Sequence, residues 1–400
     1  MNRLCIYMTY NRENKIHNYI GQVIRSLKQC SSTLCLVCNY EKIKEGKEHI
    51  AGLVDEIYYR ENKGYDSGAF RDALCDFLGW ERVYEYDELI LANDSFFGFF
   101  YPLQESFLRM EGQECDFWGM TGQTAGEFTD PYYAFDAHVH SYFMVFREKA
   151  LKSECFQRFW QELACPGSFR QAVTGYEIGI NACLKQHGFH GMSFTDLCRI
   201  RPQRNENPSY AKLYKLVRDC RVPVMKKKSV LIRNPFFADT MKTIDYLKQE
   251  GRYPVQWMLS FLDNQFYIPG MHQASEIQAD QCQAMGQESG TRQTPCNSLE
   301  IFCKSYSRIY IYGAGVCGKN LALYFSRKGW EYEGLIVTSA SDATGGAITL
   351  AQAKIGADTG IVISVLNKET AQAIAEHTDK VCGREQLFFI SDCSAIKIPV

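Results

Sequence analysis

Asn62-Lys63-Gly64-Tyr65-Asp66-Ser67-Gly68-Ala69 opens the most informative part of this chain, and Leu89-Ile90-Leu91-Ala92-Asn93-Asp94-Ser95 closes it. The first segment is rich in Gly, Asn and Asp, which favour turns, and a helical pattern follows it. The second segment is an apolar strand that ends on an acid. In an open α/β sheet, ligands bind beyond the carboxyl ends of the strands. Together the two segments predict a ligand site at the edge of a parallel sheet.

The chain outward from this part alternates apolar strands with amphipathic helices. We predict strands over 3–10, 33–39, 55–60, 87–93, 115–121 and 140–146, and helices over 15–29, 69–78, 149–164 and 176–187. Such alternation is typical of βαβ units, so we expect an α/β fold with a mostly parallel sheet flanked by helices.

Composition limits the class of protein. The 400 residues have a formal net charge of −2 and are 46% hydrophobic, which allows two or three well-packed domains and gives no overall basic field for nucleic acid. We find no signal sequence and no membrane-spanning apolar run, and we expect a cytoplasmic protein. The 17 cysteines are scattered. We therefore expect reduced, mostly buried thiols, not a disulfide framework or a zinc knuckle.

Polar residues near the predicted strand ends form the first candidate site, a pocket for a nucleoside diphosphate sugar. We place the donor on Thr9, Asn62, Gly64, Asp66, Ser67, Gly68, Arg71, Asn93 and Ser95. Gly64 and Gly68 permit positive φ and close backbone approach, and N–H groups at a helix start suit a diphosphate. The alternatives are that the glycines serve only the turn and that Asp66 is only the N-cap of the helix.

Asp94 is the candidate metal ligand. Its carboxylate follows an apolar strand and can hold Mg²⁺ or Mn²⁺, cations that prefer oxygen ligands. Such a metal stabilises a leaving nucleoside diphosphate as the glycosidic bond breaks. The alternative is a turn residue before Ser95. The segment Ala92-Asn93-Asp94 lacks the paired acids of an Asp-x-Asp motif.

Glu177 is the candidate general base. It lies at the predicted start of a helix, and an inverting transfer needs a group that takes the proton of the attacking hydroxyl. The alternative is an acid that only stabilises the helix dipole.

A third site comprises His138, His140, Ser141 and Tyr142. We assign these residues to contact with the acceptor or a phosphate. On a strand the two histidines would share a face, so metal binding is one alternative and a structural role is the other.

Five motifs in this order resemble the rhamnan synthesis protein F family of bacterial polysaccharide glycosyltransferases. Within residues 3–235 they are Asn62 to Ala69, Asn93 to Gly98, Asp116 to Thr121, His138 to Phe143 and Tyr176 to Gly179. The resemblance implies a GT-A-like fold and transfer of a sugar, often rhamnose from dTDP-rhamnose. The implied acceptor is a lipid-linked or growing glycan at the cytoplasmic face of the membrane.

A glycine-rich turn opens a separate C-terminal domain. Gly313, Gly315 and Gly318 fit G-x-G-x-x-G after a strand, and the region resembles small Rossmann-like units. The turn either binds a nucleotide or only lets a helix pack closely on the strand. About 100 residues are too few for a full dinucleotide-binding domain, so we do not expect NAD.

We therefore divide the chain into a GT-A-like domain over 1–235, a helical extension over 236–275, a linker over 276–298 and a Rossmann-like domain over 299–400. The expected function is an inverting, metal-assisted glycosyltransferase. The alternatives are a NAD-linked sugar-nucleotide oxidoreductase or epimerase, and a non-catalytic scaffold of a polysaccharide assembly complex. The basic cluster Lys226-Lys227-Lys228 is either a solvated face or a peripheral contact with anionic lipid.

Overall fold

The computed structural model describes residues 1–130, 132–198, 200, 202–203, 206–268, 297–343 and 345–393, which group into two compact units. Unit 1 comprises Met1–Ser229 and Asp239–Trp257, and unit 2 comprises Val230–Ala238 and Met258–Val400. The expected linker over 276–298 lies outside the described residues, except for its last two positions. The domain boundaries drawn from the sequence remain predictions.

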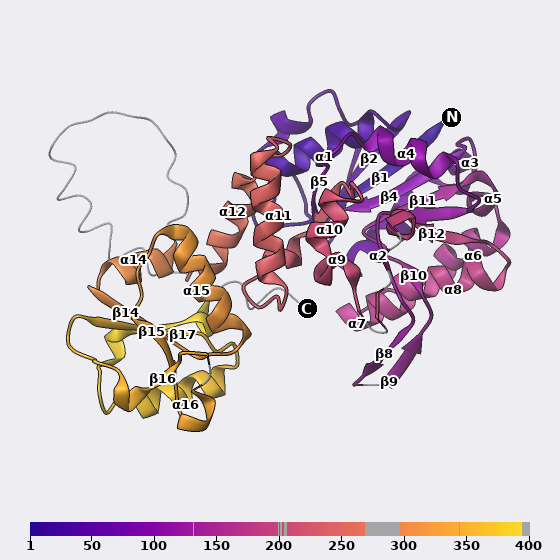
Figure 1. Cartoon of the computed structure of the whole chain (residues 1–400). Helices are drawn as coiled ribbons and strands as arrows, with labels where there is room; N and C mark the ends of the chain where they lie inside the picture. The colour runs from indigo at the N-terminus through magenta and orange to yellow at the C-terminus, as the bar shows by residue number, and fades with distance from the viewer. Residues whose placement is uncertain are drawn as a thin grey trace, which may run out of the picture. The chain divides into compact units, whose positions relative to one another are not determined.

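A seven-stranded sheet forms the centre of unit 1 (Figure 1). In spatial order it comprises β12 (Gly191–Ser193), β6 (Phe117–Gly119), β11 (Phe143–Arg147), β4 (Glu88–Asn93), β1 (Arg3–Thr9), β2 (Thr33–Cys38) and β3 (Glu56–Tyr59). β1 pairs in parallel with β2 and β4, whereas β11 runs antiparallel between β4 and β6. The expected mostly parallel sheet flanked by helices is therefore confirmed.

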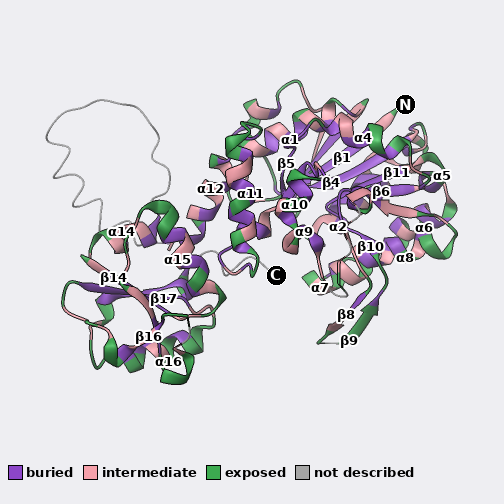
Figure 2. Cartoon of the chain, in the orientation of Figure 1, coloured by how far each residue is buried: buried purple, intermediate pink, exposed green. Residues whose placement is uncertain are grey.

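Both faces of this sheet are buried, because side chains that alternate along the strands enter two different cores. Tyr7 and Leu36 enter the core that α1 (Asn18–Lys28) and α4 (Leu103–Glu111) cover. Ile6 and Val37 enter the other core. That core is covered by α2 (Tyr65–Asp72), α5 (Glu148–Leu151), α6 (Glu154–Glu162) and α8 (Gly179–Gln186). Figure 2 shows the central strands as the buried part of the unit.

Short elements complete unit 1. Three antiparallel pairs join β5 (Phe96–Gly98) to β13 (Val224–Lys226), β7 (Gly122–Gln123) to β10 (His138–Val139), and β8 (Gly126–Thr129) to β9 (Tyr132–Phe135). The β8–β9 hairpin projects away from the sheet in Figure 1. Further helices of this unit are α3 (Trp80–Val83), α7 (Phe169–Ala172), α9 (Pro208–Ala211), α10 (Leu213–Arg218) and most of α11 (Phe237–Gln249), whereas α12 (Gln256–Asp263) lies mostly in unit 2.

Several predicted elements differ from the structure. The helix predicted over 69–78 begins already at Tyr65. The helix predicted over 149–164 is interrupted at Ser153, whose hydroxyl caps α6 by accepting a bond from Phe156 N–H at 3.3 Å. The strand predicted over 140–146 begins only at Phe143, because the preceding β10 pairs with β7 outside the main sheet. The helix predicted over 176–187 begins already at Phe169 and continues through a π-helical turn at Val173–Ile178 into α8.

Unit 2 contains a second parallel sheet of five strands. In spatial order these are β16 (Ile348–Thr349), β15 (Gly334–Val337), β14 (Arg308–Tyr312), β17 (Thr359–Ile363) and β18 (Leu387–Phe389). Its longer helices are α14 (Ser298–Lys304), α15 (Val316–Lys328) and α16 (Lys368–Thr378). The small α/β domain expected after the linker is therefore present.

In the part of the chain that the structure describes, none of the helices is both long and apolar enough to span a membrane.

The described cysteines are free thiols, and Cys165 alone among them is exposed. This agrees with the expectation of mostly buried cysteines.

Candidate active site

Two neighbouring parallel strands end at the candidate site. β1 ends on Thr9, and β4 ends on Asn93 with Asp94 directly after it. The hydroxyl of Thr9 donates to Asp94 Oδ2 at 2.9 Å, and the backbone N–H of Tyr10 donates to the same oxygen at 3.1 Å. These bonds hold the carboxylate at the carboxyl edge of the sheet, where α/β folds bind ligands.

Asn93 ties this strand end to the glycine-rich turn. Its Nδ2–H donates to Asp66 Oδ2 at 2.7 Å, and its Oδ1 accepts bonds from the backbone and the hydroxyl of Ser95 at 3.0 and 2.6 Å. Burial raises the pKa of Asp66 to about 6. The negative charge of Glu177 also raises this pKa, whereas the bond from Asn93 lowers it. The sequence-predicted Asp66, Asn93 and Ser95 thus form one hydrogen-bonded cluster, and Asp94 lies between Asn93 and Ser95 in the chain.

The turn before α2 has the expected conformation at Gly64 but not at Gly68. Gly64 has a φ of +75° and directly precedes the helix. Gly68 lies inside α2, where a Cβ would come 2.7 Å from the carbonyl oxygen of Lys63. Asp66 lies in the first helical turn, so it is not the N-cap. Ser67 is fully buried, and its hydroxyl donates to Gly64 O at 2.9 Å, which makes its contact structural.

Two of the proposed donor contacts lie apart from this cluster. Arg71 is paired with Asp72 and Asp76 at 3.1 Å each. Asn62 is exposed and accepts a bond from Asn39 Nδ2 at 3.3 Å. Asn39 was missed from the sequence, although it is a polar residue directly after β2.

Two lysines expected on an exposed face point into the site. β13 pairs with β5, and Lys227 N–H donates to Ser95 O at 2.8 Å. Lys227 Nζ consequently lies 4.0 Å from Asp94 Oδ2, with only 15% of its side chain exposed. Burial lowers the pKa of Lys227, but Asp94 and Tyr19 outweigh it and leave the pKa above its ordinary value. Lys226 Nζ lies over the ring of Tyr142 at 5.1 Å.

Glu177 faces the segment after β10. Its Oε2 accepts bonds from the backbone N–H and the hydroxyl of Ser141, both at 2.8 Å, and its Oε1 lies 3.7 Å from His138 Nε2. It stands in the π-helical turn and not at a helix start, so the helix-start interpretation is wrong. Burial raises the pKa of Glu177, but His138 and the positive charge of Lys226 outweigh it and hold the pKa well below its usual range.

His140 is neutral and fully engaged. Its Nδ1 lies 2.7 Å from Thr121 Oγ1, and its Nε2 lies 3.4 Å from the Asn207 amide, which can only donate there. Burial lowers the pKa of His140 well below its usual value. Although ligand atoms of His138, His140 and Glu177 lie within 4.8 Å of one another, Asn207 and the charge of Lys226 disfavour a cation among them.

A cavity of about 730 Å³ opens beside His138. The β9 strand and the start of α8 line it, including Phe135, Ile178 and Asn181. Asn181 fixes this wall because its side chain exchanges two hydrogen bonds with the backbone of Val139, at 2.9 and 3.0 Å. A cavity of this size has room for a second molecule beside His138, whose Nε2 lies 3.7 Å from Glu177 Oε1.

The glycine-rich turn of unit 2 borders a separate cavity of about 420 Å³, which Gly313 and Gly315 line. Gly313 has a φ of +119°, and a Cβ on Gly318 would overlap the carbonyl oxygen of Gly313. Gly318 is therefore required for packing of α15. A dinucleotide-binding turn of this kind is expected to be followed, about 20 residues on, by an acid at the end of the second strand. The residue after β15 is Thr338, whereas Glu331 and Glu333 both precede this strand.

The chain matches the sequence model of a known protein family. The rhamnan synthesis protein F family matches residues 34–280. No curated protein matches the chain.

Three solved structures are similar to the chain at low identity. Core-mannan synthase A from Aspergillus fumigatus, in its Mn/GDP form, is 11% identical over 49% of this chain and 73% of that one, with a TM-score of 0.29. A mannosyltransferase from S. cerevisiae in complex with GDP is 9% identical over 44% and 63%, with a TM-score of 0.26. A protein from Desulfovibrio desulfuricans G20, described as a nucleotide-diphospho-sugar transferase, is 11% identical over 62% of this chain and 98% of that one, with a TM-score of 0.26.

Proposed function

The chain belongs to the rhamnan synthesis protein F family, and from this premise we propose that it transfers a sugar from a nucleoside diphosphate sugar to a cell-surface glycan. The observation that carries the proposal is the convergence of Asp94, Lys227 and the Asn93–Asp66 pair at the carboxyl ends of β1 and β4. This is the edge of an α/β sheet at which nucleotides bind.

The donor diphosphate would lie between the glycine-rich turn and Lys227. The ammonium group of Lys227 supplies positive charge for the phosphates, and Asp94 holds that group in place at 4.0 Å. A divalent ion, Mg²⁺ or Mn²⁺, would be held here by Asp94 together with oxygens of the diphosphate, whose negative charge would offset the repulsion from Lys227. When bound, such an ion neutralises charge on the leaving diphosphate.

The acceptor would enter from the cavity beside His138 and present its hydroxyl to Glu177. Because the pKa of Glu177 is low, its carboxylate is ionised and accepts a hydrogen bond from that hydroxyl. Glu177 is the proposed base for an inverting transfer. Asp66 is the second candidate, because its pKa of about 6 lies closer to neutral pH.

Rhamnose from dTDP-rhamnose is the proposed donor, and a lipid-linked or growing glycan is the proposed acceptor. Both rest on the description of the family. An acceptor of this kind would bring the protein to the inner face of the membrane. That association does not rest on the basic cluster, because Lys226 and Lys227 point into the site.

The test is a donor screen by thermal shift and transfer assay, with dTDP-, UDP- and GDP-sugars in the presence and absence of Mg²⁺ or Mn²⁺. A ligand that binds only the folded chain raises the melting temperature. Asp94→Ala should abolish the shift, and Glu177→Gln should keep the shift but lower turnover by roughly 10²–10⁴-fold. Arg71→Ala is the matched control and should behave as wild type. Full turnover by either active-site variant, or a shift with NAD(H) alone, would overturn the proposal.

A further inference from the structure

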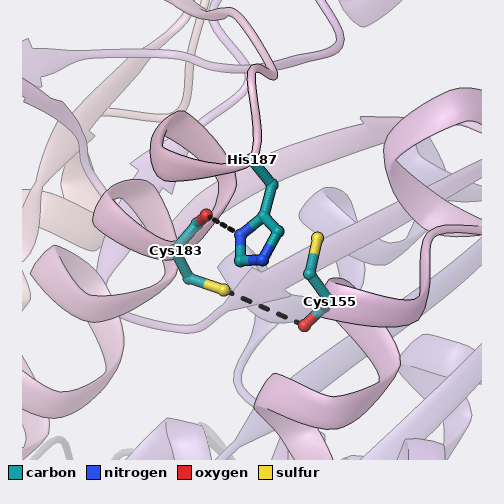
Figure 3. Close-up of side chains that lie close together, drawn as sticks. All are labelled: Cys155, Cys183 and His187. Atoms are coloured by element: carbon teal, nitrogen blue, oxygen red, sulfur yellow. Dashed lines mark hydrogen bonds between the residues drawn. The ribbon is translucent and has the colours of Figure 1, made fainter.

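Three soft metal ligands meet between two helices that cover the sheet (Figure 3). Cys155 belongs to α6, Cys183 belongs to α8, and His187 directly follows α8. The ligand atoms of the three side chains all lie within 4.8 Å of one another. None of these residues has a role in the proposed transfer, so the cluster needs its own explanation.

The local geometry follows from sequence spacing and helix packing. Cys183 and His187 are four residues apart, which places them on one face of a helix end. α6 packs against α8 in the core on that side of the sheet, and Cys155 is buried there beside them. The weak bond from Cys183 Sγ to Cys155 O, at 3.8 Å, joins the two helices directly.

The histidine is set in the tautomer that a metal requires. His187 Nδ1 lies 2.8 Å from the carbonyl oxygen of Cys183, as the dashed line in Figure 3 shows. A carbonyl can only accept, so Nδ1 carries the proton and Nε2 keeps its lone pair. Metal-binding histidines are commonly oriented by this kind of bond from the other ring nitrogen.

We propose that Cys155 Sγ, Cys183 Sγ and His187 Nε2 bind one Zn²⁺ ion. Two thiolates and one imidazole are a frequent zinc donor set, with Zn–S bonds of about 2.3 Å, which place tetrahedral sulfur ligands about 3.8 Å apart. The present spread is at most 4.8 Å, so binding would draw the sulfur atoms together by about 1 Å at most. Binding releases the two thiol protons to solvent and forms two thiolate–zinc bonds.

The fourth position faces a cavity of about 580 Å³, which Cys155, Cys183 and Glu162 line. This cavity is the entry path for the ion, and it has room for a water molecule as fourth ligand. The ion would tie α6 to the end of α8, the helix that continues from the turn carrying Glu177. The zinc site does not rest on the proposed transferase activity.

The test is metal binding by the reduced full-length chain. After treatment with a chelator, the chain is titrated with Zn²⁺ against a chromogenic competitor, and with Co²⁺ while thiolate-to-cobalt charge transfer is followed in the near ultraviolet. We expect one equivalent of Zn²⁺ per chain, a raised melting temperature and a tetrahedral cobalt spectrum. Cys183→Ser and His187→Gln should each weaken binding at least about 100-fold.

Two matched variants separate this site from other ligands. Cys165→Ser removes an exposed thiol that lines the same cavity but lies outside the cluster, and His138→Gln removes a histidine of the candidate active site. Both should bind Zn²⁺ as wild type does. Binding that survives Cys183→Ser, the absence of a stoichiometric site, or a disulfide between Cys155 and Cys183 in the protein as purified would each overturn the proposal.

Discussion

Asp66 should make the stability of unit 1 depend on pH. Burial raises its pKa to about 6 in the folded chain, whereas an unfolded aspartate titrates near about 3.9. The folded state therefore binds this proton more tightly than the unfolded state does. The resulting stabilisation is present at acid pH and is lost as the pH rises through about 6. By linkage, the cost of ionising Asp66 grows from about 1 kcal/mol near about pH 4.5 to about 3 kcal/mol near about pH 7.5.

Asp66→Asn isolates this effect. The variant keeps the shape of the side chain and does not titrate, and its amide oxygen can still accept the bond from Asn93 Nδ2. Unfolding is followed in urea by tryptophan fluorescence, which reports mainly on unit 1 because only Trp330 lies in unit 2. The unfolding free energy of wild type minus that of the variant should fall by about 2 kcal/mol over this pH range. All other titrating groups are common to both chains and cancel.

Asn93→Ala supplies the second arm of the experiment. Removing the bond that stabilises the ionised carboxylate should raise the pKa of Asp66 further and steepen the pH dependence. A wild-type-minus-Asp66→Asn difference that stays constant with pH would refute the reasoning, because it would mean that Asp66 ionises as freely when folded as when unfolded.

Three shorter predictions concern the other parts of the chain. Lys227→Met removes the ammonium group 4.0 Å from Asp94, so calorimetry without metal should give roughly 10- to 100-fold weaker binding of the donor nucleoside diphosphate. Lys227→Arg should retain most of the affinity. Equal affinities in wild type and both variants would exclude the lysine from the donor site. Ser141→Ala removes a bond to Glu177 and should raise the pKa of that carboxyl, so an acid limb of the rate profile set by Glu177 should move to higher pH. A limb near about pH 6 that is the same in both chains would argue for Asp66 as base. Gly318→Ala should destabilise unit 2 by about 1–3 kcal/mol, because its Cβ meets Gly313 O, whereas a Cβ at Gly315 has open space. Calorimetric melting that is equal for Gly318→Ala and Gly315→Ala would contradict the packing role.

Local pattern was sufficient for much of the central sheet. β1, β2 and β4 were predictable because fully buried parallel strands read as continuous apolar runs, and their bounds differ little from the structure. The position of Asp94 beside Thr9 was predictable in the same way, since adjacent parallel strands end at one edge. Both inferences use only neighbours along the chain and one general rule of topology.

Local sequence pattern could not predict the parts of the site that depend on pairing between distant strands. Lys226 and Lys227 read as a solvated basic run, and only the pairing of β13 with β5 shows that they enter the site. The sequence placed His138 and His140 on one face of a single strand. In the structure His138 lies in β10, which pairs with β7, and His140 lies just after the end of β10. A strand partner more than 100 residues away leaves no trace in the local periodicity.

By itself, the sequence determined the family, the α/β class, the strand ends and most of the acids at the site. These properties depend on short motifs, on hydrophobic periodicity and on the identity of single residues. Only the tertiary structure decided which charges face one another and which ligands meet. Cys155 and Cys183 are 28 residues apart on different helices, and Glu177 meets Ser141 across 36 residues. The packing of α6 on α8 and the π-helical turn before α8 bring these atoms within reach, and both follow from how the whole core is filled.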